Sequence, residues 1–343
     1  MAEDAKKPGL SEVAELCGVS RMTVSRVLRD DPKVSEATRQ MVLQAASRLN
    51  YFPPAYGDAA GDKKRYYVLF RKDFSLKDPF FSEIILSVQQ ELFSRNCECS
   101  FGIIGDEYEE FLKYYNMLKS GDSRGILVVG DVPNEHISAL LERFINLVLI
   151  DNPGGPGISR PYNSVYCDNA HGSYLAVKHL LDLGRRRILI IHGKEDHYFT
   201  EDMLCGYRRA LGEYGLVLDP GLTVAADFHI DGGYAATIQA LDRSLAFDAV
   251  FSNDEMACGA IRALQERAFK IPEDVSVVGF DGLALGEAIN PPLTTVTVDR
   301  PRMGRMAVKR LLELEDGSGG DEAFTRVGIF PELVIRHSSG GSP

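Results

Sequence analysis

The sequence predicts an α/β protein in which a small all-α segment precedes two lobes built on parallel sheets. Residues 10–52 show the apolar spacing of three short helices. From residue 66 onward, short apolar runs alternate with helical segments, which is typical of parallel strands joined by right-handed crossovers. The same alternation begins again near residue 164, so we expect two lobes of similar size and order.

The first two helices are expected on either side of a tight turn within residues 13–29. Gly18 stands where the chain reverses, because a residue without Cβ adopts such turns at little steric cost. Ser20 is placed to cap the second helix through its hydroxyl. The apolar residues that predict the buried faces are Val13, Ala14 and Leu16 on the first helix and Val24, Val27 and Leu28 on the second.

The outer face of the second helix carries long hydrogen-bond donors and small hydroxyls. Such a face suits a helix that lies in the major groove of DNA. The candidate DNA-binding residues are Ser20, Arg21, Met22, Thr23, Ser25 and Arg26. The spacing alone leaves open an ordinary surface helix hairpin, in which a charged outer face is normal.

A third helix is expected to begin at Ser35, whose hydroxyl suits the N-cap position. Glu36 follows in the first turn, where a negative charge suits the helix dipole. Pro53 and Pro54 end the helical pattern. Its apolar stripe is formed by Val42, Ala45, Ala46 and Leu49.

This N-terminal run resembles the DNA-binding headpiece of the LacI/GalR family of bacterial transcription regulators. The resemblance rests on three landmarks in order, VA...GVS..TVSRVL, VS..TR and LNY.P. It implies a sequence-specific transcriptional regulator, most simply a repressor, with operator DNA as a partner. It also implies a homodimer and a domain like that of periplasmic sugar-binding proteins, with a small-molecule effector between the lobes.

The resemblance implies the following domain boundaries. A headpiece is expected at 1–52, a hinge or linker at 53–65, an effector-binding and dimerisation domain at 66–338 and a tail at 339–343. Lobe one is expected at about 66–163 and 298–323, and lobe two at about 164–297 and 324–338.

The linker departs from the family's hinge helix. Pro54 stands where an asparagine is usual, and Ala60 stands where the family has a leucine that wedges into the minor groove. Gly57 and Gly61 each weaken a helix by roughly 1 kcal/mol. A flexible spacer is therefore favoured over a hinge helix that kinks DNA.

The net charge of −11 is unevenly distributed along the chain. Residues 1–56 hold 8 basic and 7 acidic residues, a net of +1, which leaves 30 basic and 42 acidic residues, a net of −12, for the remainder. Because neutralising phosphates drives much of DNA affinity, +1 is weak for a headpiece, and two copies in a dimer strengthen it. The acidic bulk is expected to face away from DNA.

The elements expected beyond the linker follow from apolar runs and helical spacing. The expected strands are 66–70, 99–104, 125–130, 146–151, 187–193, 223–228, 248–254, 275–281, 294–299 and 330–336. The expected helices are 80–94, 109–119, 171–184, 203–215, 233–240, 256–266 and 301–314, the last with Pro301 in its first turn.

In a two-lobed α/β protein, ligands bind beyond the carboxyl ends of the strands. The residues at these strand ends are Asp73, Gly130, Asp131, Asp151, His192, Asn253, Asp254 and Asp281. Carboxylates accept pairs of hydrogen bonds from vicinal hydroxyls, so the pattern favours a polar, neutral ligand such as a sugar. Helix capping is the alternative for several of them, above all for Asp254.

The resemblance implies a more specific set of effector-binding residues. Two aromatic residues after the first strand and polar or aromatic groups of the second lobe match family positions, and the strand-end rule adds Asp151 to the set. These are Phe80, Phe81, Asp151, His197, Phe228, Asn253 and Asp281. Met203 also belongs to this set, because it stands where the family commonly has a ligand-binding arginine; either the ligand class differs, another residue supplies the donor, or the site has decayed. Simple core packing is the alternative for Phe228.

Two rival functions agree less well with the sequence. A purely ligand-binding module with weak or lost DNA binding would suit the two lobes, but the charged N-terminus carries no signal-peptide core. An enzyme is disfavoured because no nucleophile elbow or metal pair appears at a meaningful spacing. The six scattered cysteines form no zinc-binding or disulfide pattern. We therefore expect a cytoplasmic, non-enzymatic protein without membrane segments, metals or cofactors.

Overall fold

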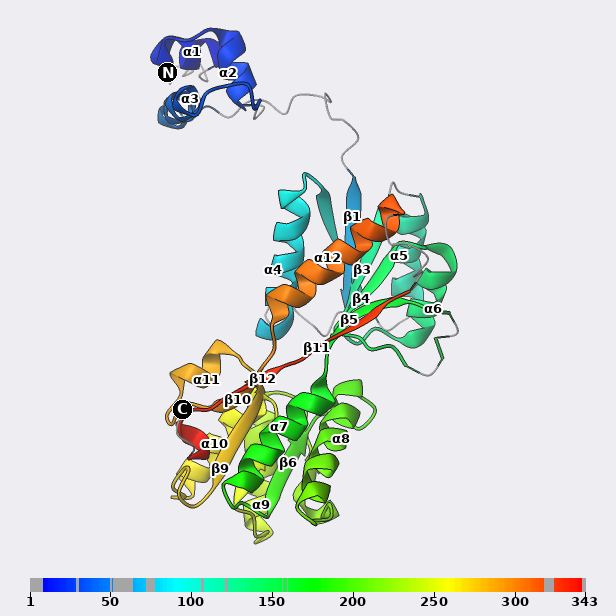
Figure 1. Ribbon diagram of the computed structural model, residues 1–343, viewed down its shortest axis with the longest axis vertical. Coiled ribbons are helices and arrows are strands. Elements are labelled where there is room, and N and C mark those ends of the chain that lie inside the picture. Colours follow the sequence, from blue (N-terminus) through cyan, green and yellow to red (C-terminus); the bar gives the residue numbers. More distant parts are fainter. Residues whose placement is uncertain are drawn as a thin grey trace, which may run out of the picture. The chain divides into compact units, whose positions relative to one another are not determined.

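The computed structural model describes residues 9–28, 31–49, 51, 64–71, 78–105, 108–120, 123–155, 157–158, 160–317 and 324–340. The chain divides into two compact units, residues 1–63 and 64–343 (Figure 1). The predicted spacer at 53–61 and the strand-end residue Asp73 lie outside the described residues.

The first unit is a bundle of three helices, α1 (Leu10–Cys17), α2 (Arg21–Leu28) and α3 (Glu36–Arg48). Gly18 has φ +65° between α1 and α2, the left-handed conformation that favours glycine. The Ser20 hydroxyl accepts the Thr23 N–H at 3.1 Å, and Ser35 accepts the Thr38 N–H at 3.3 Å. Both predicted caps are therefore confirmed.

The small core of this unit is formed by residues from all three helices. It contains Val13, Ala14, Val24, Val27, Val42, Ala45, Ala46 and Tyr51. The prediction for Leu16 is wrong, because its side chain is 50% exposed. The buried stripe of α1 runs through Leu10, Val13, Ala14 and Cys17, at i, i+3, i+4 and i+7, and Leu16 lies outside it.

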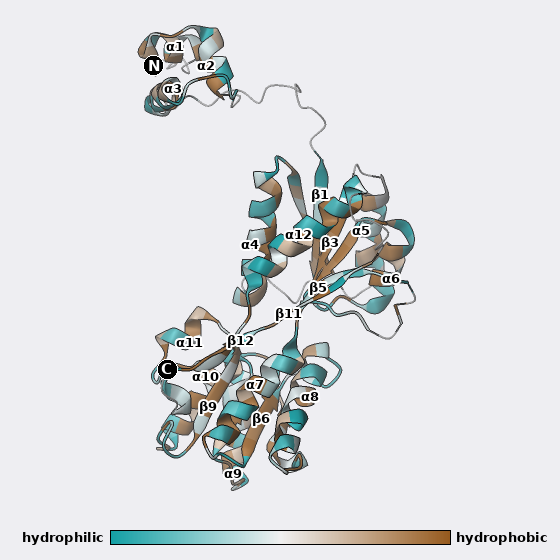
Figure 2. Cartoon of the chain, in the orientation of Figure 1, coloured by the Kyte–Doolittle hydropathy of each residue, from teal (hydrophilic) through white to brown (hydrophobic). Residues whose placement is uncertain are grey.

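Lobe one of the second unit contains a six-stranded parallel sheet in the order β11-β5-β4-β3-β1-β2. The strands are β1 (Arg65–Arg71), β2 (Glu98–Ile104), β3 (Ser123–Val129), β4 (Leu147–Ile150), β5 (Asn163–Cys167) and β11 (Arg326–Ile329). The helices are α4 (Pro79–Ser94), α5 (Tyr108–Ser120), α6 (Asn134–Arg143) and α12 (Arg300–Asp316). Figure 2 shows that the strands are mostly hydrophobic, as expected of a sheet covered by helices.

Lobe two contains a second six-stranded sheet in the order β12-β10-β9-β8-β6-β7. Its strands are β6 (Ile188–His192), β7 (Thr223–Ala225), β8 (Ala249–Phe251), β9 (Ser276–Asp281), β10 (Thr294–Thr297) and β12 (Glu332–Val334). Its helices are α7 (Asn169–Asp182), α8 (Tyr198–Glu213), α9 (Ile230–Asp242), α10 (Asp254–Glu266) and α11 (Ala284–Ala288), with 3-10 turns at Pro220–Leu222 and His337–Ser339. Among the strands of the described residues, the prediction of parallel pairing fails at the edge of this sheet, where β12 pairs antiparallel to β10.

The chain passes between the lobes three times, after β5, between β10 and α12, and between β11 and β12 (Figure 1). The predicted lobe boundaries need correction at two of these crossings. Strand β5 pairs with β4, so lobe one extends to residue 167. Strand β11 pairs with β5, so residues 326–329 belong to lobe one and only the segment after them returns to lobe two.

Several elements differ from their predicted extent. Helix α8 begins at Tyr198 and α9 at Ile230, both earlier than expected, and β7 ends at Ala225. The pattern did not predict α6, β5, α11 or β11, which are short or mixed in polarity. Across the ranges that the structure describes, every helix is too short or too polar to traverse a lipid bilayer.

Candidate functional site

The first candidate site is the outer face of α2. Arg21, Met22 and Arg26 are exposed there, and Met22 is 68% exposed. Thr23 and Ser25 are half-buried. A large apolar side chain flanked by two guanidinium groups offers a groove-binding helix both guanine donors and a contact for a thymine methyl.

Two of the predicted DNA-binding residues also have a local structural role. The hydroxyls of Ser20 and Thr23 lie 2.9 Å apart while Ser20 caps α2. Among the described residues, the Arg26 side chain makes a long ion pair, from its Nε to Asp31 Oδ2 at 3.8 Å. Its side chain is 57% exposed, so the guanidinium can reach a partner.

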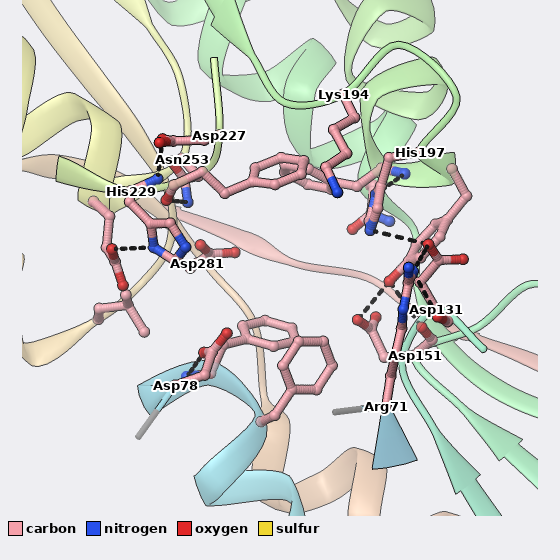
Figure 3. Close-up of a pocket in the computed structure, with 18 of the residues that line it drawn as sticks. Arg71, Asp78, Asp131, Asp151, Lys194, His197, Asp227, His229, Asn253 and Asp281 are labelled. Carbon is pink, nitrogen blue, oxygen red and sulfur yellow. Dashed lines mark hydrogen bonds and ion pairs between the residues drawn. The ribbon is translucent and has the colours of Figure 1, made fainter. Parts of the chain in front are cut away.

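The second candidate site is a cavity of about 520 Å³ lined by both lobes (Figure 3). Carboxylates dominate the charge of its wall, with Asp78, Asp131, Asp151, Asp196, Asp227, Glu255 and Asp281. The permanent cations are Arg71 and Lys194. The aromatic part of the wall consists of Phe80, Phe81, His197, Tyr198, Phe199, Phe228 and His229. Asn169, Asn253 and Leu283 complete the lining.

At one end of the cavity, Asp131 joins groups from both lobes. The Arg71 guanidinium, at the end of β1, donates to Asp131 Oδ2 at 3.3 Å. From lobe two, His197 Nε2 lies 3.8 Å from the same oxygen. Burial lowers the pKa of His197, and the neighbouring Asp131 opposes that effect. Arg71, one of the two permanent cations of the cavity wall, is therefore already paired with the Asp131 carboxylate.

A shorter link between the lobes lies beside this group. Tyr198 Oη donates to Asp151 Oδ2 at 2.7 Å and lies 2.8 Å from the Asp151 carbonyl oxygen. Asp151 is 4% exposed, and its φ of +50° is a left-handed conformation that Asp tolerates better than most residues. Burial raises the pKa of Asp151 to about 6, although the Tyr198 hydrogen bond lowers it.

At the other end, Asn253 supports the aromatic wall. Its side-chain oxygen caps α10 by accepting the Met256 N–H at 3.1 Å, and its amide donates to the Phe228 carbonyl at 3.0 Å. Phe228 has φ +70° and places its ring 5.1 Å from His197 and 5.9 Å from Phe199. Asn253 therefore holds Phe228 in an unusual backbone conformation at the cavity wall.

Asp281 ends β9 and also lines the cavity, with φ +113°. Burial raises its pKa well above the usual range, and Asp254 raises it further. Asp254 is fully buried and has a structural role, since it accepts the Leu283 N–H at 2.6 Å and the Thr295 hydroxyl at 2.5 Å. Helix capping, the alternative role considered for Asp254, is performed by Asn253.

The structure places most of the predicted effector-binding residues on one cavity. Phe80, Phe81, Asp151, His197, Phe228, Asn253 and Asp281 all line it, as does the strand-end residue Asp131. The prediction for Met203 is corrected: its side chain is fully buried in the hydrophobic core. It lies five residues into α8, about 7.5 Å along the helix from Tyr198, which reaches the cavity. His192 is also buried, with Nδ1 2.7 Å from the Gly193 carbonyl.

Sequence reasoning missed several lining residues. Arg71 is the last residue of β1, so the strand-end rule selected Asp73 two positions too late. Asp78 caps α4 by accepting the Phe80 N–H at 2.9 Å, and an Asp-Pro pair before a helix could have indicated it. Tyr198 is the first residue of α8 and lines the cavity. It was missed because the predicted helix begins at residue 203.

Two family models match the chain, one for bacterial regulatory proteins of the lacI family at residues 9–54 and one for a periplasmic binding protein-like domain at 177–339. The transcriptional repressor PurR of Vibrio atlanticus is 32% identical, over 95% of this chain and 97% of that protein. The transcriptional regulator DegA of Bacillus subtilis is 30% identical, over 97% and 98%.

Solved structures give the same result. A complex of the transcriptional regulator CelR with cellobiose has a TM-score of 0.73 at 30% identity and covers 96% of this chain and 99% of that chain. The lac repressor dimer bound to operator and the anti-inducer ONPF has a TM-score of 0.73 at 25% identity, covering 97% and 99%.

A helix-turn-helix unit followed by a two-lobed α/β domain with a ligand-sized cavity defines the class of DNA-binding regulators that respond to small molecules. The matches extend over nearly the whole length of both chains. The chain belongs to the LacI family of bacterial transcription regulators, which are not enzymes.

Proposed function

We propose that this protein is a transcriptional repressor whose operator affinity is controlled by an uncharged saccharide bound between the lobes. The charge and shape of the cavity wall carry this proposal. Seven acidic side chains face two permanent cations, and although burial raises the pKa of Asp151 and Asp281, one of the cations, Arg71, is already paired with Asp131. Such a wall repels phosphorylated or carboxylated ligands, whereas carboxylate oxygens accept hydrogen bonds from sugar hydroxyls.

Aromatic rings supply the other half of saccharide recognition. Phe80 from lobe one and Phe228 from lobe two both line the cavity, so apolar ring faces are available from both sides. Apolar lining with a few polar groups is typical of small-molecule sites, and about 520 Å³ lies in the usual range. The cellobiose complex of the related CelR gives further support for a saccharide of this size.

We propose that base readout comes from Arg21, Met22 and Arg26, with Ser20, Thr23 and Ser25 contacting the backbone or bases beside them. Arg21, Met22 and Arg26 are exposed on α2 and have long side chains that can extend to the base edges. The two arginines can donate hydrogen bonds to guanine, and Met22 can contact a thymine methyl group. The hydroxyl residues suit phosphate contacts, which fix the orientation of a recognition helix on DNA.

We propose that the protein is a homodimer through lobe one. Helix α4 exposes Leu86 (52%) and Phe93 (81%), and the edge strand β2 exposes Phe101 (44%) and Ile103 (46%). An exposed edge strand beside apolar side chains is a surface that a protein ordinarily covers. The related lac repressor was solved as a dimer on operator DNA, where two-fold symmetry matches near-palindromic sites.

The test uses pairs of saccharides that differ by one phosphate group. Cellobiose and other neutral disaccharides should raise the melting temperature of the full chain and change its gel-shift affinity for DNA upstream of its own gene. The 6-phosphates of the same sugars should do neither. Asp281→Ala should abolish the saccharide response and leave ligand-free DNA binding intact. Stabilisation by the phosphorylated sugars in place of the neutral ones would contradict the proposed ligand class.

A further inference from the structure

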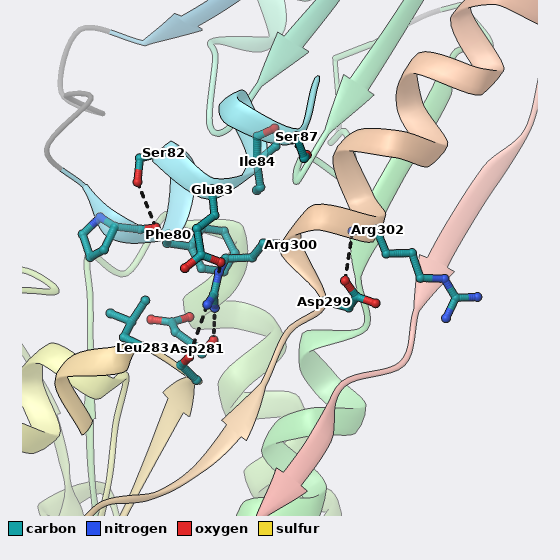
Figure 4. Close-up of polar contacts among 12 residues, drawn as sticks. Phe80, Ser82, Glu83, Ile84, Ser87, Asp281, Leu283, Asp299, Arg300 and Arg302 are labelled. Atoms are coloured by element: carbon teal, nitrogen blue, oxygen red, sulfur yellow. Dashed lines mark hydrogen bonds and ion pairs between the residues drawn. The ribbon is translucent and has the colours of Figure 1, made fainter. Parts of the chain in front are cut away.

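Arg300, the first residue of α12, is buried although it carries a charge, with 5% of its surface exposed. Its Nε donates to Glu83 Oε2 of α4 at 2.9 Å. Its Nη1 donates to the Asp281 carbonyl and its Nη2 to the Gly282 carbonyl at 3.2 Å (Figure 4). One guanidinium therefore joins lobe one, through Glu83, to the end of β9 in lobe two.

The partners of Arg300 border the cavity. Asp281 lines the cavity, and so does Phe80, whose ring centroid lies 5.6 Å from the Arg300 guanidinium carbon. Arg300 itself is not among the lining residues. The guanidinium lies behind the wall, between the Phe80 ring of lobe one and the Asp281–Gly282 backbone of lobe two.

The backbone that Arg300 contacts is in a conformation that needs support. Asp281 has φ +113° and Gly282 has φ +68°, both outside the region that L-residues favour. Two donors from one planar group fix the two successive carbonyls, and Glu83 balances the buried charge. The amides that follow are held from the other side, by Thr295 Oγ1 for Gly282 and by Asp254 for Leu283.

We propose that Arg300 is a positioning residue for effector binding. It fixes the Asp281–Gly282 turn, so that the Asp281 carboxylate is presented to the cavity, and it ties that turn to Phe80 and Glu83 of lobe one. Arg300 thereby fixes the position of Asp281 in lobe two relative to Phe80 in lobe one, and these are the groups proposed to contact the effector. This inference rests on the proposed effector site, but its main test requires no effector.

The main test is hydrogen–deuterium exchange of the full-length protein without ligand. In Arg300→Gln, the Gly282 and Leu283 amides should exchange at least about tenfold faster, because two charge-assisted bonds to their turn are lost. The β9 amides of Val277 and Val278 should keep their wild-type rates. Arg302→Gln is the matched control, since Arg302 stands on the same turn of α12 with its side chain exposed and directed away (Figure 4).

Two further variants separate positioning from general stability. Arg300→Lys keeps the charge but lacks the planar fork, so its exchange at Gly282 and Leu283 should remain closer to Arg300→Gln than to wild type. Glu83→Gln changes a half-exposed side chain and should fold even if Arg300→Gln does not. It should raise exchange at the same two amides by a few fold and leave β9 unchanged.

Equal acceleration throughout β9 and α10, or wild-type exchange at Gly282 and Leu283 in Arg300→Gln and Glu83→Gln, would overturn the proposal. A second measurement uses cellobiose as the probe, by titration calorimetry. If the wild type binds it, Arg300→Gln should weaken the Kd at least about tenfold and Arg302→Gln should not. If the wild type does not bind cellobiose, only the saccharide class is affected, and the exchange results still decide the role of Arg300.

Discussion

Tyr198, the first residue of α8 in lobe two, donates its hydroxyl to the buried carboxylate of Asp151 at the end of β4 in lobe one, with Oη and Oδ2 2.7 Å apart. The same hydroxyl lies 2.8 Å from the Asp151 carbonyl oxygen. This direct hydrogen bond between the lobes closes one end of the cavity. A change of Tyr198 to Phe removes the bond and keeps the aromatic ring.

Tyr198→Phe should lower the free energy of unfolding by about 1–3 kcal/mol, because Asp151 then loses its donor while remaining buried. Urea unfolding of the full chain at pH 7.5 measures the change. Tyr234→Phe is the matched control, since its hydroxyl bonds Glu266 on the exposed surface, and it should stay within about 0.5 kcal/mol of wild type. An equal loss of unfolding free energy in the two variants would show that the hydrogen bond between the lobes stabilises the fold no more than a surface hydrogen bond does.

Asp151 should make stability depend on pH. Burial raises its pKa to about 6, so the folded state binds this proton more tightly than the unfolded chain. Its stabilising contribution is therefore complete below the unfolded pKa of about 4 and is lost as pH rises through about 6. The Asn side chain of Asp151→Asn does not ionise, so the variant should not show this decrease in stability as the pH rises.

The comparison of Asp151→Asn with wild type measures this effect. Unfolding free energies at pH 4.5 and pH 7.5 should show the variant gaining roughly 2 kcal/mol relative to wild type at the higher pH. Asn also tolerates the positive φ at this position, so the backbone need not change. A constant difference at both pH values would mean that Asp151 titrates near its ordinary pKa.

Arg26→Ala should cost on the order of 1–3 kcal/mol of operator affinity and relax specificity at one base pair, because its exposed guanidinium suits a guanine edge. Fluorescence anisotropy with operator and single-base variants measures both effects. Arg48→Ala on α3 removes the same charge from another helix and serves as the control. An equal loss on operator and random DNA would assign Arg26 to phosphate contact.

Phe93→Glu should convert the proposed dimer to a monomer, because it places a charge on the apolar surface that α4 and β2 expose. Sedimentation velocity at micromolar concentration distinguishes the two states. Val217→Glu changes an equally exposed apolar residue of lobe two, 88% exposed, and should remain dimeric. Removal of residues 1–63, a compact unit of its own, should also leave a dimer. A monomeric truncation would place the interface in the headpiece.

The sequence by itself determined the features that depend on local spacing. Apolar periodicity and two hydroxyl caps identified the three N-terminal helices, and both caps form as predicted at Ser20 and Ser35. Alternation of apolar runs and helical segments predicted two parallel-sheet lobes, and the strand-end rule brought Asp131, Asp151, Asn253 and Asp281 to one cavity. These inferences succeed because each depends on a few neighbouring residues and on one general property of parallel sheets.

Only the tertiary structure decided which side chains meet across the lobes. Tyr198 reaches Asp151, and Arg300 reaches Asp281, over separations in sequence that carry no periodic signal. The same holds for Met203, which a position in the family pattern assigned to the ligand and which helix α8 directs into the core. A contact between distant segments depends on helix boundaries, sheet order and packing together, so a shift of one turn in α8 changes which residue faces the cavity.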